Sequence, residues 1–589
     1  MGASAAVTPM SGKSIREPHF ITLLCLAWLL VAFCLLMLNW AGTAETLNDT
    51  DDAMRLVQMR AWLAGQGWFD LHQARVQPPL GFDSHWSRLI DAGLAGLLLL
   101  FSQFTDQAFA ERLMRATWPL LWLFPTMAGM AALAWRIAGR AAALVGLLLA
   151  VGGVAAYRQF IPGRIDHHNV QIALTLLVVA ATAWSDRVRW TAAAAGALSG
   201  LALAIGFESL PYVAACGGAF TLRYVCAPDA APALRAYALA LAIGTLAGFF
   251  ISVGPDRWMH HACDAIAINT VAPVVAGSLS LAMLSLAGHR RAALCLVLAA
   301  VVAATALTFE PRCLGGPFAM VDPAIWPVWL GEVRELQPLL GAMSQNPVSG
   351  IAIATFPAAA VVAALMLAGD GRLRQDFGFL TAAAAFALAV VVMLAAIRGF
   401  SYAIWLGMPL VATAVVRLCT RLETLAARLL AAIIVTPMVL SAVAMTIASA
   451  AGLNDHDDPA RSATRACLRS ANYGPLAQLA PGLVVADVNY GPFLLALTPH
   501  SVMAAPYHLL SAGIVDAHRA LAAPPEEARE VLRRTRATYV MICGSQPPSA
   551  LTAAERSASL WGRLHAGAVP DWLAPVLHTP AFKVYRIAA

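Results

Sequence analysis

The stretch FITLLCLAWLLVAFCLLMLNWAG, residues 20–42, decides the class of fold. It carries no charged residue, and it is long enough for a helix to cross the hydrocarbon core of a bilayer, which is about 30 Å thick. It is also too long for the apolar segment of a cleavable signal peptide. The acidic stretch NDTDDAMR, residues 48–55, follows closely. The sequence therefore predicts a membrane span that leads directly into a polar segment.

The composition extends this prediction to most of the chain. Hydrophobic residues make up 60% of the 589 residues, and charged residues make up only 12%. Soluble globular proteins carry about 25% charged residues. The chain is therefore predicted to be a polytopic α-helical membrane protein. This excludes a disordered, fibrous or nucleic-acid-binding protein, so the expected partners include the membrane and no nucleic acid.

Apolar runs of about 17 to 25 residues predict about thirteen membrane-spanning helices. The runs are 20–42, 117–136, 141–158, 169–185, 190–207, 209–225, 236–253, 264–287, 292–308, 349–369, 377–397, 402–416 and 429–450. The run 89–104 is shorter, and counting it as a span would put the basic loops that follow it on the wrong side. We expect it to form a helix that lies in or dips into the outer leaflet.

The distribution of basic residues predicts the orientation. The net charge of +6 comes from every second loop, and these loops contain Lys13/Arg16, Arg136/Arg140, Arg187/Arg189, Arg223/Arg235, Arg290/Arg291, Arg372/Arg374 and Arg417/Arg421/Arg428. Cytoplasmic loops of membrane proteins keep Lys and Arg. The N-terminus is therefore predicted to be cytoplasmic and the C-terminus external. Residues 1–450 would form the membrane domain, with long external loops at 43–116 and 309–348.

The pattern changes at about residue 451. Strand-like runs at 483–488 and 538–542, with a helical stretch at 525–535, predict a small external α/β domain over residues 451–589. This domain contains Cys467 and Cys543. An oxidising compartment would permit a disulfide between them, and two buried free thiols are the alternative.

Two polar clusters stand at predicted helix ends on the external side. Asp49, Asp51 and Asp52 crowd together after the first span, and such carboxylates repel one another unless a cation relieves them. Oxygen ligands of this kind suit Mg²⁺ or Mn²⁺, and the alternative is an acidic turn that caps the following helix. The second cluster is Asp166-His167-His168, between the third and fourth spans. Ionisable residues at the mouth of a bundle are functional candidates, with a helix cap as the alternative.

Two further candidates lie in later external segments. Glu335, in the stretch VREL of residues 333–336, could bind or activate an acceptor, and an ordinary loop acid is the alternative. Arg398 follows the eleventh span, where its guanidinium suits a phosphate. Snorkelling of Arg398 to lipid headgroups is the alternative. Less specific candidates for the lining of a pocket are Glu208, Asp256, Arg257, Trp258, His260 and His261.

In this order and topology, the motifs resemble the catalytic subunit of oligosaccharyltransferases and, more broadly, the GT-C class of membrane glycosyltransferases. The stretch DDAMR (51–55) resembles the acidic motif that supplies the metal-binding Asp of that family. The resemblance leaves Asp51, Asp52 and also Asp49 open as the equivalent residue. Asp166-His167-His168 is similar to the second motif in its archaeal form. Glu335 matches a loop Glu that touches metal and acceptor, and Arg398 matches the Arg that holds the donor phosphate.

This resemblance implies a GT-C fold and a metal-dependent glycosyltransferase. A divalent cation, Mg²⁺ or Mn²⁺, would be held by Asp51 or Asp52 together with Asp166 and His168. The donor would be a sugar or glycan on a polyprenyl phosphate, and the acceptor a lipid, a polysaccharide or a protein. High Ala content and basic residues that are mostly Arg are typical of a GC-rich bacterial genome. We therefore expect a bacterial inner-membrane protein whose C-terminal domain is periplasmic.

One family motif departs from the pattern. The Trp-Trp-Asp-Tyr-Gly motif that reads an acceptor sequon is replaced by VADVNYG, residues 485–491, without either Trp. The resemblance therefore does not carry sequon recognition over to this chain. A protein N-glycosylating oligosaccharyltransferase remains the alternative enzyme. A transporter or flippase of lipid-linked glycans is the alternative from another class, although the acids gather at one face and no internal repeat is visible.

Overall fold

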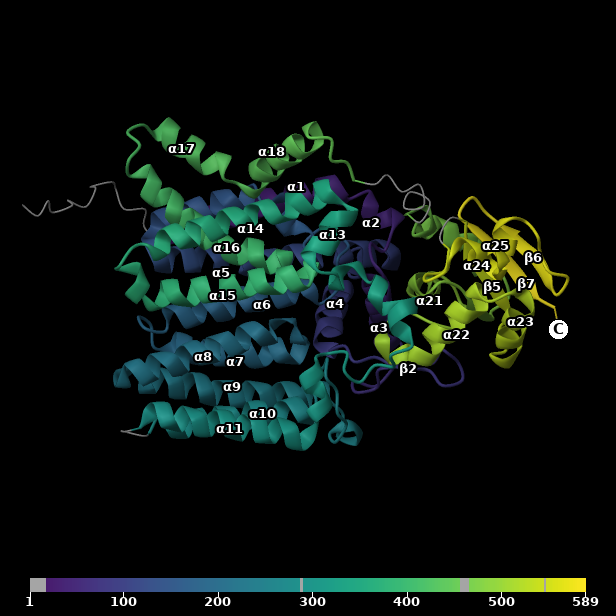
Figure 1. Cartoon of the computed structure of the whole chain (residues 1–589), viewed down its shortest axis with the longest axis horizontal. Coiled ribbons are helices and arrows are strands. Elements are labelled where there is room, and N and C mark those ends of the chain that lie inside the picture. The colour runs from purple at the N-terminus through teal and green to yellow at the C-terminus, as the bar shows by residue number, and fades with distance from the viewer. Residues whose placement is uncertain (1–16, 287–289, 456–464, 545–546, 589) are drawn as a thin grey trace, which may run out of the picture.

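The computed structural model describes residues 17–286, 290–455, 465–544 and 547–588. Long helices run side by side through most of the molecule, and a smaller unit with a sheet lies at one end of them (Figure 1). The long helices are α1 (Glu17–Asn39), α5 (Gln107–Val151), α6 (His168–Trp184), α7 (Trp190–Ile205), α8 (Leu210–Cys226), α9 (Ala231–Ser252), α10 (Ile268–Leu284), α11 (Arg291–Phe309), α14 (Pro347–Ala368), α15 (Phe377–Ala395) and α16 (Phe400–Cys419). Helix α5 consists of two helices, because its backbone is not helical at Ala138 and Gly139.

By length and apolarity, seven of the described helices could cross a membrane, and an eighth crossing is possible if a bent pair counts as one span. Their outward-facing residues are apolar: Leu26, Leu30 and Phe33 of α1 are all more than half exposed. Such a surface is suited to lipid rather than water, so the chain is a multi-pass membrane protein. Every predicted range is largely helical, but α6, α7, α8 and α10 have only 16 or 17 residues. The number of crossings therefore stays a prediction.

The single helix predicted over 429–450 is two helices in the structure. Helix α17 (Leu425–Ile434) and helix α18 (Pro437–Ala450) meet at an angle of 60°. Pro437 cannot donate the backbone hydrogen bond that would continue α17. The hydroxyl of Thr436 instead accepts from the backbone N–H of Val439 and caps the start of α18.

The basic loops gather at the end of the bundle that is opposite the sheet. The guanidinium of Arg136 is buried there between the carboxylates of Asp186 and Asp376, at 2.5 and 3.0 Å. Arg417 likewise pairs with Asp370 at 2.5 Å. These contacts bring the predicted cytoplasmic loops together, whereas the side of the membrane that they face stays a prediction. Lys13 and Arg16 lie outside the described residues.

The first long loop is held by a buried ion cluster. It contains α2 (Gly42–Glu45), α3 (Thr50–Leu63), β1 (His72–Gln73), β2 (Phe82–Asp83) and α4 (Arg88–Phe101), and α4 runs across the ends of the long helices (Figure 1). The carboxylate of Asp91 accepts from Arg55 at 3.1 Å, from Gln58 at 2.7 Å and from Arg88 at 3.0 Å. All four side chains are buried. The cluster fixes α3 against α4, and the position of α4 relative to a membrane stays a prediction.

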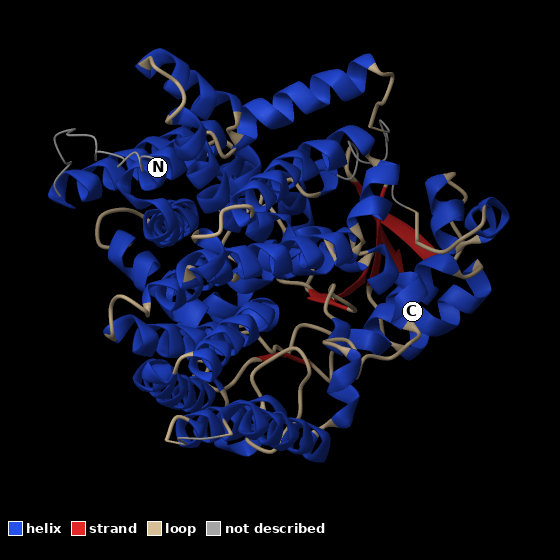
Figure 2. Ribbon diagram, turned by 60° about the vertical axis from the view of Figure 1, so that its left-hand side comes forward, coloured by secondary structure: helices blue, strands red, loops and turns tan. Residues whose placement is uncertain are grey.

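The C-terminal residues form a mixed sheet, whose strands are drawn in red in Figure 2. The strand order is β4-β3-β5-β7-β6. Strands β4, β3 and β5 are parallel, and β7 and β6 add to β5 in antiparallel fashion. Cys467 and Cys543 are joined by a disulfide. The elements are α20 (Gly474–Ala477), β3 (Leu483–Val485), α21 (Gly491–Leu497), β4 (Ser501–Val502), α22 (Ser511–Ala522), α23 (Pro525–Arg534), β5 (Tyr539–Cys543), α24 (Ala553–Ala558), α25 (Leu560–His565), β6 (Leu573–His578) and β7 (Phe582–Ile587).

This C-terminal unit shares its core with the first long loop. Buried residues of α3 and α4 and buried residues of the sheet belong to one continuous apolar cluster. Arg60 of α3 donates to the carbonyl of Ala496 at 2.7 Å, and the backbone N–H of Gln77 donates to the carbonyl of Val502 at 2.7 Å. The structure therefore packs the C-terminal unit, from residue 465 on, against the loop 43–116, and the boundary at 450/451 stays a prediction.

Candidate active site

The three acids after α1 have different surroundings. Asp49 caps α3 by accepting from the backbone N–H of Thr50, and it pairs with Arg164 at 2.6 Å. Asp52 is buried, pairs with Arg164 at 3.0 Å and accepts from the backbone N–H groups of Ile165 and Asp166 at 2.7 and 3.0 Å. The carboxylate of Asp51 makes no hydrogen bond or ion pair with any residue that the structure describes, and it faces a cavity. Asp51 is therefore the one free to bind a ligand.

The second motif reaches α3 because Gly163 permits a close approach. Gly163 has a φ of +102°, and a Cβ atom there would lie 2.3 Å from the side-chain amide of Asn48. A side chain at residue 163 would be both strained and in collision. The amide of Asn48 instead donates to the carbonyl of Pro162 at 3.1 Å. Two segments that are far apart in the sequence are thereby fastened together at the mouth of the bundle.

A chain of charged contacts runs from Asp166 to Arg398. Asp166 contacts Nδ1 of His167 at 2.5 Å and Nε2 of His168 at 3.0 Å. Nδ1 of His168 contacts Glu208 at 2.9 Å, and the same oxygen of Glu208 lies 3.5 Å from Nη1 of Arg398. Sequence reasoning placed Glu208 only as a pocket-lining residue. The structure makes it the link between the second motif and Arg398, and an acid at the outer end of a predicted span was the available signal.

Glu335 lies beside Arg398. The long loop that carries it also contains α12 (Ile325–Val328) and α13 (Leu339–Gln345), and Glu335 sits in a short turn between them. The carbonyl of Gln337 accepts from the backbone N–H of Ile397 at 2.8 Å, which ties this loop to the segment of Arg398. Glu335 and Arg398 line both the main cavity, of about 650 Å³, and a second cavity of about 230 Å³.

The main cavity collects side chains from distant parts of the chain. Its wall includes Asp51, His85, Trp86, His167, His168, Glu208, Arg257, His260, His261, Asp264, Glu335, Arg398, Tyr507 and His508. Of the less specific candidates, Asp256 and Trp258 are not part of this wall. Asp52 is absent from it as well, and Asp166 lies just behind the two histidines. Asp51, His168, Glu335 and Arg398 thus face one space.

The pKa values of Asp51 and Asp166 are shifted in opposite directions. Burial raises the pKa of Asp51 well above its usual value, and the like charges of Asp166 and Asp49 raise that pKa further. Burial also acts to raise the pKa of Asp166, but the imidazoles of His167 and His168 hold that pKa well below its usual range. Asp51 is therefore a crowded carboxylate, and the charge of His168 lowers its pKa only in part. Ligand atoms of Asp166, His167 and His168 lie within 4.8 Å of one another. A divalent cation at this group would relieve the crowding at Asp51, so the side chains fit a metal.

The C-terminal unit contributes Tyr507 to the cavity rather than the segment 485–491. Tyr507 donates to the carbonyl of Thr50 at 3.3 Å and packs against Phe82 and Trp86. Asp487 accepts from the backbone N–H of Asn489 within its own turn, at 3.0 Å. No residue of 485–491 is in the wall of the cavity. The segment that replaces the sequon-reading motif thus lies away from the other candidates.

Comparison of the sequence with models of protein families and with curated proteins gives no match. Among solved structures, the fold is similar to that of an oligosaccharyltransferase from Archaeoglobus fulgidus. Its apo form gives a TM-score of 0.67 at 13% identity, covering 90% of this chain and 70% of that chain. An oligosaccharyltransferase from the same organism, named AglB, in complex with an inhibitory peptide and a dolichol-phosphate gives a TM-score of 0.65 at 11% identity, with the same coverage of 90% and 70%.

A third structure of the Archaeoglobus enzyme, a complex with Zn and sulfate, gives a TM-score of 0.60 at 13% identity, covering 89% of this chain and 68% of that chain. At these identities the likeness concerns the fold. The chain has the fold of the GT-C membrane glycosyltransferases, with a small C-terminal sheet, as the sequence predicted.

Proposed function

We propose that this protein is a membrane glycosyltransferase that moves a sugar or glycan from a polyprenyl-phosphate-linked donor to an acceptor. The observation that carries the proposal is the single space faced by Asp51, His168, Glu335 and Arg398. The fold of the GT-C glycosyltransferases supports the same reaction. A second cavity that also contains Glu335 and Arg398 fits a reaction with two substrates that meet at these residues.

Arg398 would bind the phosphate of the donor. Its guanidinium is about one third exposed to the cavity, and Glu208 at 3.5 Å orients it. Tyr402 donates to the other oxygen of Glu208 at 3.0 Å, so the position of Glu208 is fixed in turn. A planar guanidinium offers paired N–H donors to phosphate oxygens. These donors would stabilise the charge that develops on the leaving phosphate, which is usually the largest contribution in such transfers.

A divalent cation, Mg²⁺ or Mn²⁺, would be held by Asp51, Asp166 and His168. When bound, it would supply positive charge at the leaving phosphate. Asp52 would not be a ligand, because its carboxylate already accepts from two backbone N–H groups and pairs with Arg164. Asp49 would likewise serve as a helix cap. The three acids of the first motif thus divide into one ligand and two positioning residues.

Glu335 would orient or deprotonate the nucleophile of the acceptor. A general base must lie within hydrogen-bond reach of the proton that it takes, and Glu335 stands where the two cavities meet. The acceptor would be a lipid, a polysaccharide or a protein group other than a sequon Asn. The position of residues 485–491 away from the cavity supports this preference. The reaction would take place at the outer face of a bacterial inner membrane, with the C-terminal unit periplasmic.

Analysis of polyprenyl-linked sugars in cells tests the proposal. Cells that lack the protein are expected to accumulate one such lipid, and cells that carry Asp166→Asn are expected to accumulate the same one. Wild-type protein and the control Asp83→Asn, an exposed acid outside the cavity wall, should restore normal amounts. If Asp166→Asn also restores normal amounts, the assignment of Asp166 as a metal ligand is wrong. Transport of lipid-linked glycans would then explain the accumulation better than transfer.

Arg398→Lys tests the phosphate assignment. Lysine keeps the positive charge but loses the paired donors, and one hydrogen bond to a charged group is worth about 1.5–3 kcal/mol. We expect the purified variant to turn over the accumulated donor about 10- to 100-fold more slowly, chiefly through a higher KM for the donor. Arg257→Lys, at another arginine of the same cavity, should leave the rate nearly unchanged. Equal losses in the two variants would mean that only the overall charge of the cavity matters.

A further inference from the structure

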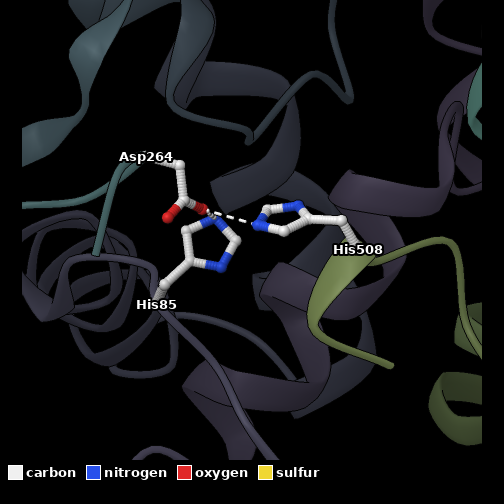
Figure 3. Close-up of side chains that lie close together, drawn as sticks. All are labelled: His85, Asp264 and His508. Carbon is white, nitrogen blue, oxygen red and sulfur yellow. Dashed lines mark ion pairs between the residues drawn. The ribbon is translucent and has the colours of Figure 1, made fainter. Parts of the chain in front are cut away.

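Three ligand-type side chains from three separate segments meet at the rim of the main cavity. His85 lies between β2 and α4, Asp264 lies between α9 and α10, and His508 lies in the C-terminal unit (Figure 3). Nε2 of His508 is 2.8 Å from Oδ2 of Asp264, and Nε2 of His85 is 3.4 Å from the same oxygen. One ligand atom from each residue lies within 4.8 Å of the other two.

The atoms of this cluster are left without hydrogen bonds. Oδ2 of Asp264, Nε2 of His508 and Nδ1 of His85 are buried, and none of them makes a hydrogen bond with a described residue. Buried polar atoms are almost always satisfied, so the unsatisfied Oδ2 of Asp264 and Nε2 of His508, which face each other, call for an explanation. The atom of His85 that faces them is Nε2. Figure 3 shows that the two imidazole rings and the carboxylate point toward one another. Nε2 of His508 and Oδ2 of Asp264 lie at the distance of an ion pair, which Figure 3 marks with a dashed line, yet neither atom makes a hydrogen bond with a described residue. Groups that converge on one point in this way are arranged as metal ligands are.

We propose that His85, Asp264 and His508 bind a zinc ion that clamps the C-terminal unit to the two external segments. Ligand atoms about 2.0–2.1 Å from a tetrahedral Zn²⁺ lie roughly 3.3–3.4 Å apart. The separation of 3.4 Å between His85 and Asp264 matches this value, and the separation of 2.8 Å between His508 and Asp264 would widen when the ion binds. Two imidazoles and one carboxylate suit Zn²⁺, whereas Mg²⁺ prefers oxygen ligands alone. All three residues line the cavity, so a water molecule from the cavity would be the fourth ligand of the zinc ion.

The surroundings of the three residues indicate what the clamp does. Cys263, directly before Asp264, forms a disulfide with Cys313 in the turn after α11. Tyr507, directly before His508, packs on the first loop and lines the cavity. Apart from the chain itself, no covalent bond among the described residues joins the segment of Asp264 to the C-terminal unit. The zinc ion would supply that connection and hold the wall of the cavity closed at this point.

This site is separate from the metal centre of the proposed function. It shares no residue with the Asp166-His167-His168 group, and it stands whether or not the protein transfers a sugar. The experiment therefore uses full-length protein in detergent with Asp166→Asn as the background, so that the other centre is weakened throughout. The protein is stripped with a chelator, dialysed and loaded with Zn²⁺ alone. Bound zinc is then measured by elemental analysis, together with the thermal unfolding temperature.

We expect one zinc equivalent per chain and a higher unfolding temperature after loading. His508→Gln and Asp264→Asn should each lose that equivalent and the rise in unfolding temperature. His260→Gln, a histidine of the same cavity wall outside the cluster, should keep both. Equal zinc content in His508→Gln and His260→Gln would overturn the proposal.

Cobalt spectroscopy keeps the proposal testable if His508→Gln fails to fold. Co²⁺ takes the place of Zn²⁺ and reports its ligands through its absorption. The parent protein should show the intense visible bands of tetrahedral Co²⁺. His508→Cys retains a metal-binding side chain, and it should add an absorption band from sulfur-to-metal charge transfer. A spectrum without tetrahedral bands in the parent, or without the added band in His508→Cys, would rule out ligation by His508.

Discussion

Asp51→Asn is expected to reduce transfer by at least about 100-fold, the scale seen when one electrostatic stabiliser of a transition state is removed. Asn cannot supply the negative charge that a cation would need at this position. The variant should fold normally, because the Asp51 carboxylate has no partner among the described residues. Its unfolding temperature should equal or exceed that of the wild type, because the like charges around Asp51 are relieved. Turnover of the accumulated donor by purified protein measures the loss of transfer.

The neighbouring acids provide matched controls for Asp51. Asp49→Asn should retain most of the activity, since Asn is also a good helix cap. Asp52→Asn should lower the yield of folded protein, because Arg164 loses a buried partner and the N–H groups of Ile165 and Asp166 lose a carboxylate. Size-exclusion chromatography separates that folding defect from a catalytic one. A stable, fully active Asp51→Asn beside an inactive, folded Asp49→Asn would refute the assignment.

Asp91→Ala is expected to open the first external loop. The change leaves the guanidinium groups of Arg55 and Arg88 buried without their carboxylate, and breaking a buried ion pair costs about 3–5 kcal/mol. The effect should be local, since the cluster joins α3 to α4 and, through Arg88, to Gln66 and Asp70 in the segment between them. Hydrogen exchange of the peptides that cover these two helices measures it. Their exchange should accelerate by about 100-fold or more, because local opening then requires less free energy.

An exposed pair in the same loop serves as the control for Asp91. Asp83 contacts His72 at 2.8 Å, and its side chain is 57% exposed. Exposed ion pairs contribute about 0–1 kcal/mol, so Asp83→Ala should barely change the exchange of α3 and α4. Asp91→Ala should also slow transfer, although Asp91 does not line the cavity, because α3 carries Asp51. Exchange in α3 and α4 that is equally slow in both variants would mean that the buried cluster is not what holds the loop.

The helices were predictable because each depends on local sequence. Apolar runs give the positions of α1 and α14–α16, and the polar motifs fall at helix ends because charged residues are excluded from the bilayer. The bend at Pro437 was missed because a hydropathy window averages over a single proline. The roles of Asp49, Asp51 and Asp52 could not be separated in the sequence, since the difference lies in Arg164, which is more than a hundred positions away.

Contacts between distant segments account for most of what the sequence did not predict. Glu208 resembles an ordinary interfacial acid until it is seen between His168 and Arg398. His85, Asp264 and His508 form no motif, because they are brought together only when three segments pack. The disulfide between Cys263 and Cys313 was not predictable, since nothing in the sequence marks these two cysteines as a pair. Such pairings depend on tertiary packing, which composition and periodicity do not encode.

The core shared by the first loop and the C-terminal unit has a consequence for biosynthesis. Arg60 and its partner Ala496 are 436 residues apart in the chain. A ribosome that adds about 5–20 residues per second needs roughly 20 to 90 s to make that stretch. During this time the apolar face of α3 is without its final partner, so it depends on chaperones or transient contacts. The wall of the cavity likewise lacks Tyr507 and His508 until the C-terminal unit has been made.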